Sequence, residues 1–503
     1  MRGLGRKGDS VLAGASQRLE HELLPRGGMR SGYERFKIQT TLAPPRRKQP
    51  RPFNPQVNKI RLAKWLVGEL LSYRFKLADR AYRKALLSRP CIYGTFSGPF
   101  GGFRPIRDKC AGCMRCVQEH PAMCRISRNP EFFGFTDSYW IPRDPATAVS
   151  SPVATVSYEA STGNIPIKGM GYRDSFADEG WDSMWTDMSE IVRPTRDGVY
   201  GREYISTLAD VGRKPRLLEF DRQQPMQSSR TIQISVPIIF DYLPENLNSQ
   251  SIVRSAAAAA RRLGTLYVAS AEQMRGMNRS LCKRVVPLIS SSDLGKHAKI
   301  VAEAPAVELT EHNSRLVDRV RELNPKTPIS VRLPLRENAG AHAAKMAREG
   351  VDIIHAFADY HGRAWEPDNR GFVKDLIRSV HGTLVKESLR DEVTLIASGG
   401  ITLAEHVPKA IACGADLVAL DTTVLVALQA RFQGEYASSE KGRIRPEEFE
   451  ETWGEQRLVN LVGSWHDQLI EILSAMGIRD IRRLRGDVGR AMFREDLEKE
   501  AFG

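Results

Sequence analysis

Apolar runs alternate with amphipathic segments through the second half of the chain. Residues 393–430 read as an apolar run (393–397), a Ser-Gly-Gly turn, an amphipathic helix (403–413) and a second apolar run (415–420). Another turn and helix begin at Asp421. Apolar strands that alternate with helices of about ten residues predict parallel β-strands joined by right-handed crossovers. The last quarter of a (β/α)8 barrel has this pattern.

Shorter apolar runs upstream predict the other strands of the same barrel. The first lies at residues 236–241 and is followed by a helix through the alanine run 256–260. These elements predict an α/β fold, a (β/α)8 TIM barrel over residues 231–435, with closing helices in residues 436–503. The further strands are expected at residues 265–270, 284–289, 299–304, 329–333 and 351–357.

The N-terminal part of the chain lacks this alternation. Residues 1–58 show little periodicity, which predicts an extended or partly ordered arm. Residues 60–87 place apolar side chains such as Leu62, Trp65 and Leu66 at helical spacing, with basic side chains opposite. Such a helix packs on the barrel or on a partner, and its basic face also allows peripheral contact with a membrane. Arm and helix form the first predicted region, residues 1–90.

Composition and charge limit the class of protein. The chain has 503 residues, 41% hydrophobic and 27% charged, as expected for a globular domain of about 250 residues with additions. No apolar run approaches the ~20 residues that span a bilayer, and no signal-peptide pattern is present, so we expect a cytoplasmic protein. The formal charge is +14 and the pI about 9.5. Because no nucleic-acid-binding motif accompanies this charge, we expect a partner subunit or redox carrier, or a solvated arm, rather than nucleic acid; a homo-oligomer stays open.

A cysteine run stands between the arm and the barrel. Cys110, Cys113 and Cys116 are each three positions apart, the spacing with which bacterial ferredoxins surround one inorganic cluster. His120 stands where the fourth ferredoxin ligand is expected, and the next thiol is Cys124. Either Cys124 completes a 4Fe–4S cluster or His120 supplies a nitrogen ligand, and tetrahedral zinc is the alternative metal. The preferred ligands, Cys110, Cys113, Cys116 and Cys124, belong to a predicted cluster segment and connecting lobe at residues 91–230.

Two turns late in the chain have the chemistry of an anion site. Gly399 and Gly400 follow Ser398 and carry no Cβ, so the backbone can turn sharply and present N–H groups, and the next helix N-terminus adds further donors. Thr422 and Thr423 offer two hydroxyls at the start of the following helix. These two turns therefore predict a phosphate site, although a Ser-Gly-Gly sequence also serves simply as a tight turn.

Residues from about 236 to 485 resemble the FMN-binding barrel of the glutamate synthase family. In that family the seventh strand ends in a Gly-Gly turn and the eighth reads Gly-Ala, four mostly apolar positions and Gly-Thr; this chain has Gly399-Gly400 and the segment 414–422, with Asp421 in place of the glycine. A ferredoxin-type segment before the barrel is similar to the short, archaeal-type members. The resemblance implies FMN and a 4Fe–4S cluster as cofactors.

The resemblance also implies individual site residues. The strand Ile-Ser-Val-Arg-Leu, residues 329–333, resembles the family's Ile-Ser-Val-Lys-Leu, whose lysine sits by the flavin, so Arg332 would stabilise negative charge on the reduced ring. Glu272 is similar in place to the glutamate of a Gly-Glu-Gly turn, and His355 precedes a loop where the family has several glycines. The implied catalytic residues are Glu272, Arg332 and His355, and the implied cofactor-binding residues are Ser249, Arg332, Ser398, Gly399, Gly400, Thr422 and Thr423.

Three functions are compatible with these patterns. The leading one is an FMN and iron–sulfur oxidoreductase, similar to glutamate synthase, that acts on a carbon–nitrogen substrate or relays electrons to a partner subunit. The alternative is a non-catalytic structural or electron-transfer subunit that has lost FMN. A third, a phosphate-substrate barrel enzyme, would leave the cysteine run without a purpose.

Overall fold

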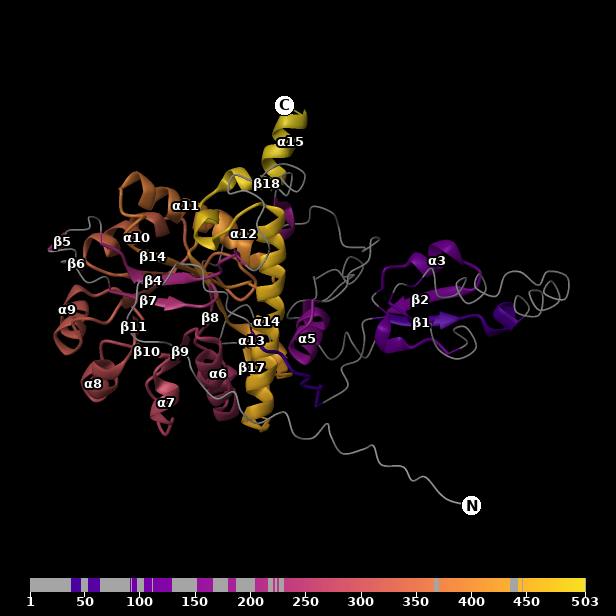
Figure 1. Ribbon diagram of the computed structural model, residues 1–503, viewed down its shortest axis with the longest axis horizontal. Helices are drawn as coiled ribbons and strands as arrows, with labels where there is room; N and C mark the ends of the chain where they lie inside the picture. Colours follow the sequence, from indigo (N-terminus) through magenta and orange to yellow (C-terminus); the bar gives the residue numbers. More distant parts are fainter. Residues whose placement is uncertain are drawn as a thin grey trace, which may run out of the picture. The chain divides into compact units, whose positions relative to one another are not determined.

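A computed structural model of the chain contains a closed barrel of parallel strands (Figure 1). The strand order is β10-β11-β12-β13-β14-β15-β8-β9, so the first and last strands of the sequence pair to close the ring. The predicted TIM barrel is therefore confirmed. Its strands are β8 (Ile238–Phe240), β9 (Tyr267–Ser270), β10 (Val285–Ile289), β11 (Val307–Leu309), β12 (Ile329–Pro334), β13 (Ile353–Phe357), β14 (Thr394–Ser398) and β15 (Leu417–Leu420).

The structure describes the barrel almost continuously and the N-terminal third in pieces. The described residues are 38–46, 53–63, 91, 93–96, 104–110, 112–128, 152–165, 180–186, 204–215, 220–221, 224–225, 230–365, 371–434, 442–445 and 447–502. Most of the expected helix at 60–87 lies outside them. Within these residues, the search for a helix with the length and apolar character needed to cross a bilayer finds none.

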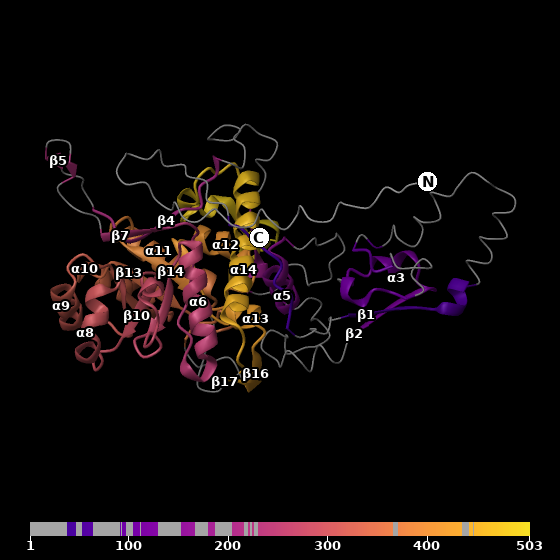
Figure 2. The ribbon, with the colours of Figure 1, turned by 60° about the horizontal axis from the view of Figure 1, so that its bottom comes forward.

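Helices follow the strands around the outside of the barrel (Figure 2). Local sequence explains their limits: Ser249 accepts the backbone N–H of Ile252 at the start of α6, and Gly264 ends that helix with φ 67°. Four alanines of the predicted run are buried on the inner face of α6. The helices are α6 (Gln250–Leu263), α7 (Arg279–Cys282), α8 (Leu294–Glu303), α9 (Ser314–Leu323), α10 (Ala339–Arg348), α11 (Val373–Lys386), α12 (His406–Ala412) and α13 (Thr422–Ala427).

The strand expected at residues 299–304 was wrong. These residues belong to α8, in which Val301 is buried and its neighbours Ala302 and Glu303 are exposed. The actual fourth strand is the short β11, Val307–Leu309, whose central residue is the buried Glu308. A charged residue in the middle of a three-residue strand hides the apolar pattern on which the expectation rested.

A hairpin closes the end of the barrel where the strands begin. Strands β4 (Ala209–Arg213) and β7 (Arg230–Ile234) pair antiparallel, and their buried side chains pack against residues from the barrel interior. The Gly212 N–H donates to Thr394 Oγ1 at 2.9 Å, at the first residue of β14. The opposite end, where the strands finish, is the barrel mouth.

The long helix α14 (Glu451–Ala475) packs against α6, α13 and α5 (Pro152–Thr162). Its Arg457 side chain is fully buried, and the guanidinium donates to three segments far apart in sequence: to Ala427 O at 2.5 Å, to Ala43 O at 2.9 Å and to Ser161 Oγ at 2.8 Å. This arginine therefore joins the segment 38–46, helix α5 and the end of α13 to the closing helix.

A short part of the connecting region also contacts the barrel. The η3 turn (Gly180–Ser183) leads into β3 (Met184–Thr186), which pairs with β18 (Ala491–Phe493). Trp181 and Met184 are buried, and Met184 Sδ lies 3.6 Å from Cys413 Sγ on the barrel. These residues pack, as expected for tryptophan and methionine in irregular gaps.

The cysteine run belongs to a small unit that we call the cysteine lobe. It consists of strand β1 (Phe53–Val57), residues 91 and 93–96, the 3-10 turn η2 (Arg107–Lys109), helix α3 (Arg115–Glu119) and strand β2 (Cys124–Arg128). Strands β1 and β2 pair antiparallel, with Val57 opposite Cys124. The end of the expected arm thus contributes a strand to the lobe.

Candidate functional site

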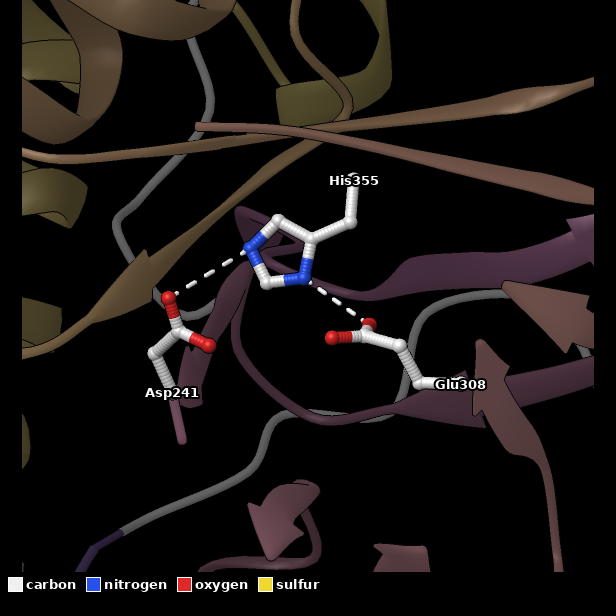
Figure 3. A group of neighbouring side chains, drawn as sticks. All are labelled: Asp241, Glu308 and His355. Carbon is white, nitrogen blue, oxygen red and sulfur yellow. Dashed lines mark hydrogen bonds and ion pairs between the residues drawn. The ribbon is translucent and has the colours of Figure 1, made fainter. Parts of the chain in front are cut away.

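Four charged or titratable side chains converge inside the barrel mouth. Asp241 follows β8, Glu308 lies on β11, Arg332 on β12 and His355 on β13. The Arg332 guanidinium donates to Asp241 at 2.7 and 3.3 Å and to Glu308 at 2.9 Å. The His355 ring lies between the two carboxylates, with Nδ1 at 2.9 Å from Glu308 and Nε2 at 3.6 Å from Asp241 (Figure 3). We call these four residues the mouth cluster.

The charges of the mouth cluster stabilise one another. Burial by itself would raise the pKa of Asp241, but the charges of Arg332 and His355 hold it below its ordinary value. Burial likewise opposes ionisation of Glu308, and the charge and hydrogen bond of His355 lower its pKa. The two carboxylates in turn raise the pKa of Arg332. Both acids are therefore ionised at neutral pH, held by a permanent cation.

The mouth cluster also has the donor set of a cation site. Among the described residues, Asp241, Glu308 and His355 form the one group whose three donor atoms all lie within 4.8 Å of one another. However, Arg332 already contacts both carboxylates, and His355 Nε2 lies 3.1 Å from Ser398 Oγ. A divalent cation would have to compete with the guanidinium for the same oxygens, so the arrangement is an internal ion network.

The predicted phosphate donors lie next to this cluster but are engaged by the chain itself. The Asp421 carboxylate accepts the backbone N–H of Thr422 at 2.5 Å and its hydroxyl at 2.9 Å. The Thr423 hydroxyl donates to Ile401 O at 2.6 Å. Burial, reinforced by the charge of Asp241, raises the pKa of Asp421 to about 7. A carboxyl group thus takes the place at the start of α13 where an anion would bind.

The turn at Gly399 and Gly400 is likewise in contact with the chain's own atoms. Gly399 and Gly400 have φ of 93° and 70°, which favours glycine, but a Cβ built on them would lie 2.5 Å from Asp359 O and 2.6 Å from Gly362, respectively. The glycines therefore allow the loop after β13 to pack closely on the turn. Trp181 adds a lid: its Nε1–H donates to Gly400 O at 3.1 Å.

These contacts decide whether the phosphate of FMN fits. A phosphate site should leave its donors accessible when protein atoms alone are counted, yet the side chains of Ser398, Thr422 and Thr423 are at most 1% exposed. Burial and the charges of Asp421 and Asp241 raise the pKa of Tyr360, so this side chain lies near both carboxyl groups. The residues present do not fit the phosphate in this arrangement.

The structure brings some of the expected site residues together and leaves others apart. Arg332, His355 and Ser398 meet in the mouth. Ser249 is the N-cap of α6, and its assignment as a cofactor-binding residue stays a prediction. The Glu272 side chain is half exposed after β9 and pairs with Arg275 at 3.1 Å and with His297 at 3.5 Å, away from the mouth cluster. Its assignment as a catalytic residue stays a prediction.

Sequence reasoning missed two members of the mouth cluster, Asp241 and Glu308. Each carried a signal. Asp241 comes directly after an apolar strand, where barrel enzymes place functional side chains. Glu308 is the only charge in the run Ala-Val-Glu-Leu, and a charged residue flanked by strand-forming apolar residues is rarely buried without a partner.

Five cysteines converge in the cysteine lobe. Cys91, Cys110, Cys116 and Cys124 are buried and Cys113 is partly buried, among apolar side chains such as Phe96. Burial raises the pKa of Cys110 to about 12, and the hydrogen bond with Cys124, together with burial, raises that of Cys116. Such thiols become ligands only when a metal replaces the proton.

The spacing of these sulfurs fits a cluster better than a single ion. In tetrahedral zinc sites the sulfurs are about 3.8 Å apart, as Zn–S bonds of about 2.3 Å require. Within the part of the chain that the structure describes, no three cysteine sulfurs all lie within 4.8 Å of one another. Four of the cysteines instead line one cavity, namely Cys91, Cys110, Cys113 and Cys116. The donor set therefore fits an inorganic cluster, which holds its thiolates farther apart.

The family comparison agrees with the fold. Residues 304–479 match the family model described as "Conserved region in glutamate synthase", which covers the barrel from the end of α8 to the end of α14. Over these residues the barrel is similar to that of glutamate synthases. It is 25% identical to an archaeal-type glutamate synthase (NADPH) of Dehalococcoides mccartyi over 82% of this chain and 93% of that protein. It is 24% identical to the archaeal glutamate synthase (NADPH) of Archaeoglobus fulgidus over 84% and 95%.

Solved structures with similar backbones include a double mutant of flavocytochrome b2 with pyruvate bound, at a TM-score of 0.44 and 12% identity over 64% of this chain and 79% of that one. An IMP dehydrogenase/GMP reductase-like protein from Corynebacterium glutamicum matches at a TM-score of 0.41 and 16% identity, over 62% of this chain and 94% of that one.

Proposed function

We propose that this protein is an oxidoreductase of the glutamate synthase type that carries electrons on a 4Fe–4S cluster in its cysteine lobe. The observation that carries the proposal is the set of cysteines that line one apolar cavity, in a chain whose full-length relatives are named glutamate synthases. A disulfide role is a poor explanation, because four buried thiols and one partly buried thiol lie in one small lobe and all are free.

FMN is the cofactor that the relatives' family implies for the barrel, and with it a carbon–nitrogen substrate. In this form of the proposal, the flavin would supply the hydride chemistry when bound. Arg332 at the mouth would hold a positive charge beside the ring. The phosphate end opposes this form, because Asp421 already accepts the N–H and hydroxyl of Thr422.

Asp421 therefore favours a second candidate function, that of an electron-transfer or structural subunit whose barrel has lost FMN. A protein with one cluster and no second redox group needs a donor and an acceptor, so this candidate requires a partner subunit or a redox carrier. The strongly basic sequence before residue 90 offers an acidic partner a binding surface, and peripheral membrane contact is the other use of that charge.

Metal and flavin analysis of the full chain, purified without oxygen, tests both candidates. We expect about four iron and four sulfide ions per chain and an absorbance near 400 nm that bleaches with dithionite, as for ferredoxin-type clusters. Reduced protein should give the electron paramagnetic resonance signal of one cluster. Stoichiometric FMN would select the flavoenzyme, and cluster iron without flavin would select the electron-transfer subunit. Protein that contains neither iron nor sulfide after anaerobic reconstitution would overturn the proposal.

A further inference from the structure

We propose that Cys91, and not Cys124, supplies the fourth thiolate of the cluster. This inference rests on the proposed function, since it concerns the ligands of the same cluster. Cys91 stands well before the ferredoxin-like run and was not among the ligands that the spacing predicted. The structure places it with that run.

The cavity of the cysteine lobe distinguishes the two candidates. Cys91, Cys110, Cys113 and Cys116 all line it, together with Tyr93, Thr95, Phe96 and Gly112. Cys124 does not line it. A cluster in this cavity would therefore meet four sulfurs without Cys124.

The backbone around Cys91 has the form of a ligand loop. Gly94, with φ 68°, turns the chain so that its N–H donates to Cys91 O at 3.1 Å, and the next N–H, that of Thr95, donates to Cys91 Sγ at 3.3 Å. Thr95 O then accepts the N–H of Ile106 at 2.7 Å, which ties this loop to the run. An N–H aimed at a sulfur stabilises the thiolate and raises the potential of a cluster bound to it.

The same kind of donation serves the run itself. Backbone N–H groups of Gly112 and Arg115 donate hydrogen bonds to the sulfurs of Cys110 and Cys113. Cys91 therefore shares with two expected ligands both the position on the cavity and the N–H donor.

Cys124 has a different surrounding. It is the first residue of β2, where its backbone is held opposite Val57, and its sulfur is hydrogen-bonded to that of Cys116. Cys124 thus contacts a ligand, Cys116, but does not line the cavity. In ferredoxins with two clusters, the fourth cysteine of the run binds the other cluster, so three cysteines of such a run are ordinarily completed by a distant one. Cys91 corresponds to that distant cysteine. Cys124 corresponds to a thiol that hydrogen-bonds to the ligand Cys116 without binding the cluster itself.

Substitution of each cysteine in the full chain tests the assignment. C91A should reduce iron from about four to about three or fewer per chain and remove or convert the resonance signal of the reduced cluster. C124A should keep full iron, with a shifted reduction potential because the hydrogen bond to Cys116 is lost. C282A is the matched control, since Cys282 lies on the barrel helix α7 and should change nothing.

A fold check and a rescue keep this test decisive. The far-ultraviolet circular dichroism of C91A reports whether the barrel still folds, and C91S offers an oxygen ligand that should restore part of the iron with altered g values. Full iron in C91A, or loss of iron in C124A with or without loss in C91A, would overturn the assignment. An absence of iron and sulfide in the unsubstituted protein would instead overturn the proposed function.

Discussion

The cysteine lobe and the barrel mouth differ in how well their donor groups fit a cofactor. In the lobe, four thiols line one cavity, and the backbone N–H of Thr95 donates to the sulfur of Cys91, a contact that a metal-bound thiolate can keep. In the mouth, the donors expected for a flavin phosphate face Asp421, Ile401 and the loop after β13. Both regions contain the residue types that their chemistry requires. The two regions differ in whether the chain's own atoms already occupy the place of the cofactor.

This difference teaches that a ligand site depends on whether the contacts of its donors can persist when the ligand binds, as much as on donor identity. Thr422 and Thr423 occur where a phosphate-binding barrel needs hydroxyls, yet both are fully buried and hydrogen-bonded. The carboxyl group of Asp421 alone takes the place of a bound anion at the start of α13. The lobe contains no comparable internal substitute for a cluster among its described residues.

The largest effect is expected from removal of an undisputed cluster ligand. C110A should take the iron content from about four to about three or fewer per chain, as expected for C91A, because three remaining thiols hold a cubane poorly. Anaerobic iron and sulfide analysis measures this. The thermal unfolding of the barrel should be nearly unchanged, and a barrel that unfolds together with the cluster would show that the two regions are coupled.

The next effect concerns the charge balance of the mouth. R332M would leave Asp241 and Glu308 buried without their permanent cation, which should reduce the free energy of unfolding by about 3–5 kcal/mol. Urea denaturation followed by circular dichroism measures it. R348M is the control: Arg348 pairs with Glu387 on the surface, with both side chains more than 40% exposed, and should cost about 0–1 kcal/mol. Equal losses in the two variants would mean that the mouth cluster is not a buried ion network.

Replacement of Asp421 should make the barrel mouth a better site for the phosphate of FMN. D421G removes the carboxylate from the N–H of Thr422, and the freed donors should strengthen FMN binding by about 1–3 kcal/mol, roughly ten- to a hundred-fold. Quenching of flavin fluorescence measures the affinity. Riboflavin, which lacks the phosphate, is the matched control and should show no such gain. The same affinity for FMN in both proteins would contradict the role given to Asp421.

The raised pKa of Asp421 predicts a pH dependence. Between about pH 4 and its folded pKa of about 7, the folded chain retains a proton that the unfolded chain has released, so this group lowers stability as pH rises and has no further effect above that range. The free energy of unfolding of the natural chain, relative to that of D421N, should therefore fall by up to about 1.4 kcal/mol for each unit by which the pH rises within this range. Asp241 and Tyr360, which face this carboxyl, are the same in both proteins. A difference that is constant from pH 5 to pH 8 would exclude a titrating Asp421.

The smallest effect is expected at Glu272. Its carboxylate is half exposed and pairs with an exposed Arg275, so E272Q should change stability by less than about 0.5 kcal/mol and leave iron content unchanged. If the protein proves to oxidise or reduce a substrate, E272Q also tests the catalytic role that the family resemblance implied. A large loss of turnover without loss of stability would support that role.

The sequence predicted the barrel because its strands and helices differ in period. Runs such as residues 393–397 and 415–420 are mostly apolar, interrupted only by Thr394 and Asp416, as expected for strands covered on both faces. The prediction was wrong for the fourth strand, β11, because Glu308 interrupts an apolar run of only three residues. Its burial depends on Arg332 and His355, which come from other strands, and no local pattern reports such partners.

The candidate sites show the same limit. Spacing identified Cys110, Cys113 and Cys116, because ligands on one short loop are recorded in the order of the chain. Cys91 reaches the same cavity through a separate loop, so only the tertiary structure associates it with the run. At the mouth, the sequence identified Asp421 as unusual but could not show that its carboxylate turns back to its own helix.

The buried guanidinium of Arg457 has a consequence for how this molecule can be divided. A fragment that began at residue 231, the expected start of the barrel, would lack Ala43 and Ser161, two of the acceptors of that side chain. The arginine would then remain inside with dangling N–H groups, a penalty on the order of several kcal/mol. The smallest autonomous piece of this chain should accordingly retain residues 38–46 and α5, and a shorter one should be recovered as insoluble material.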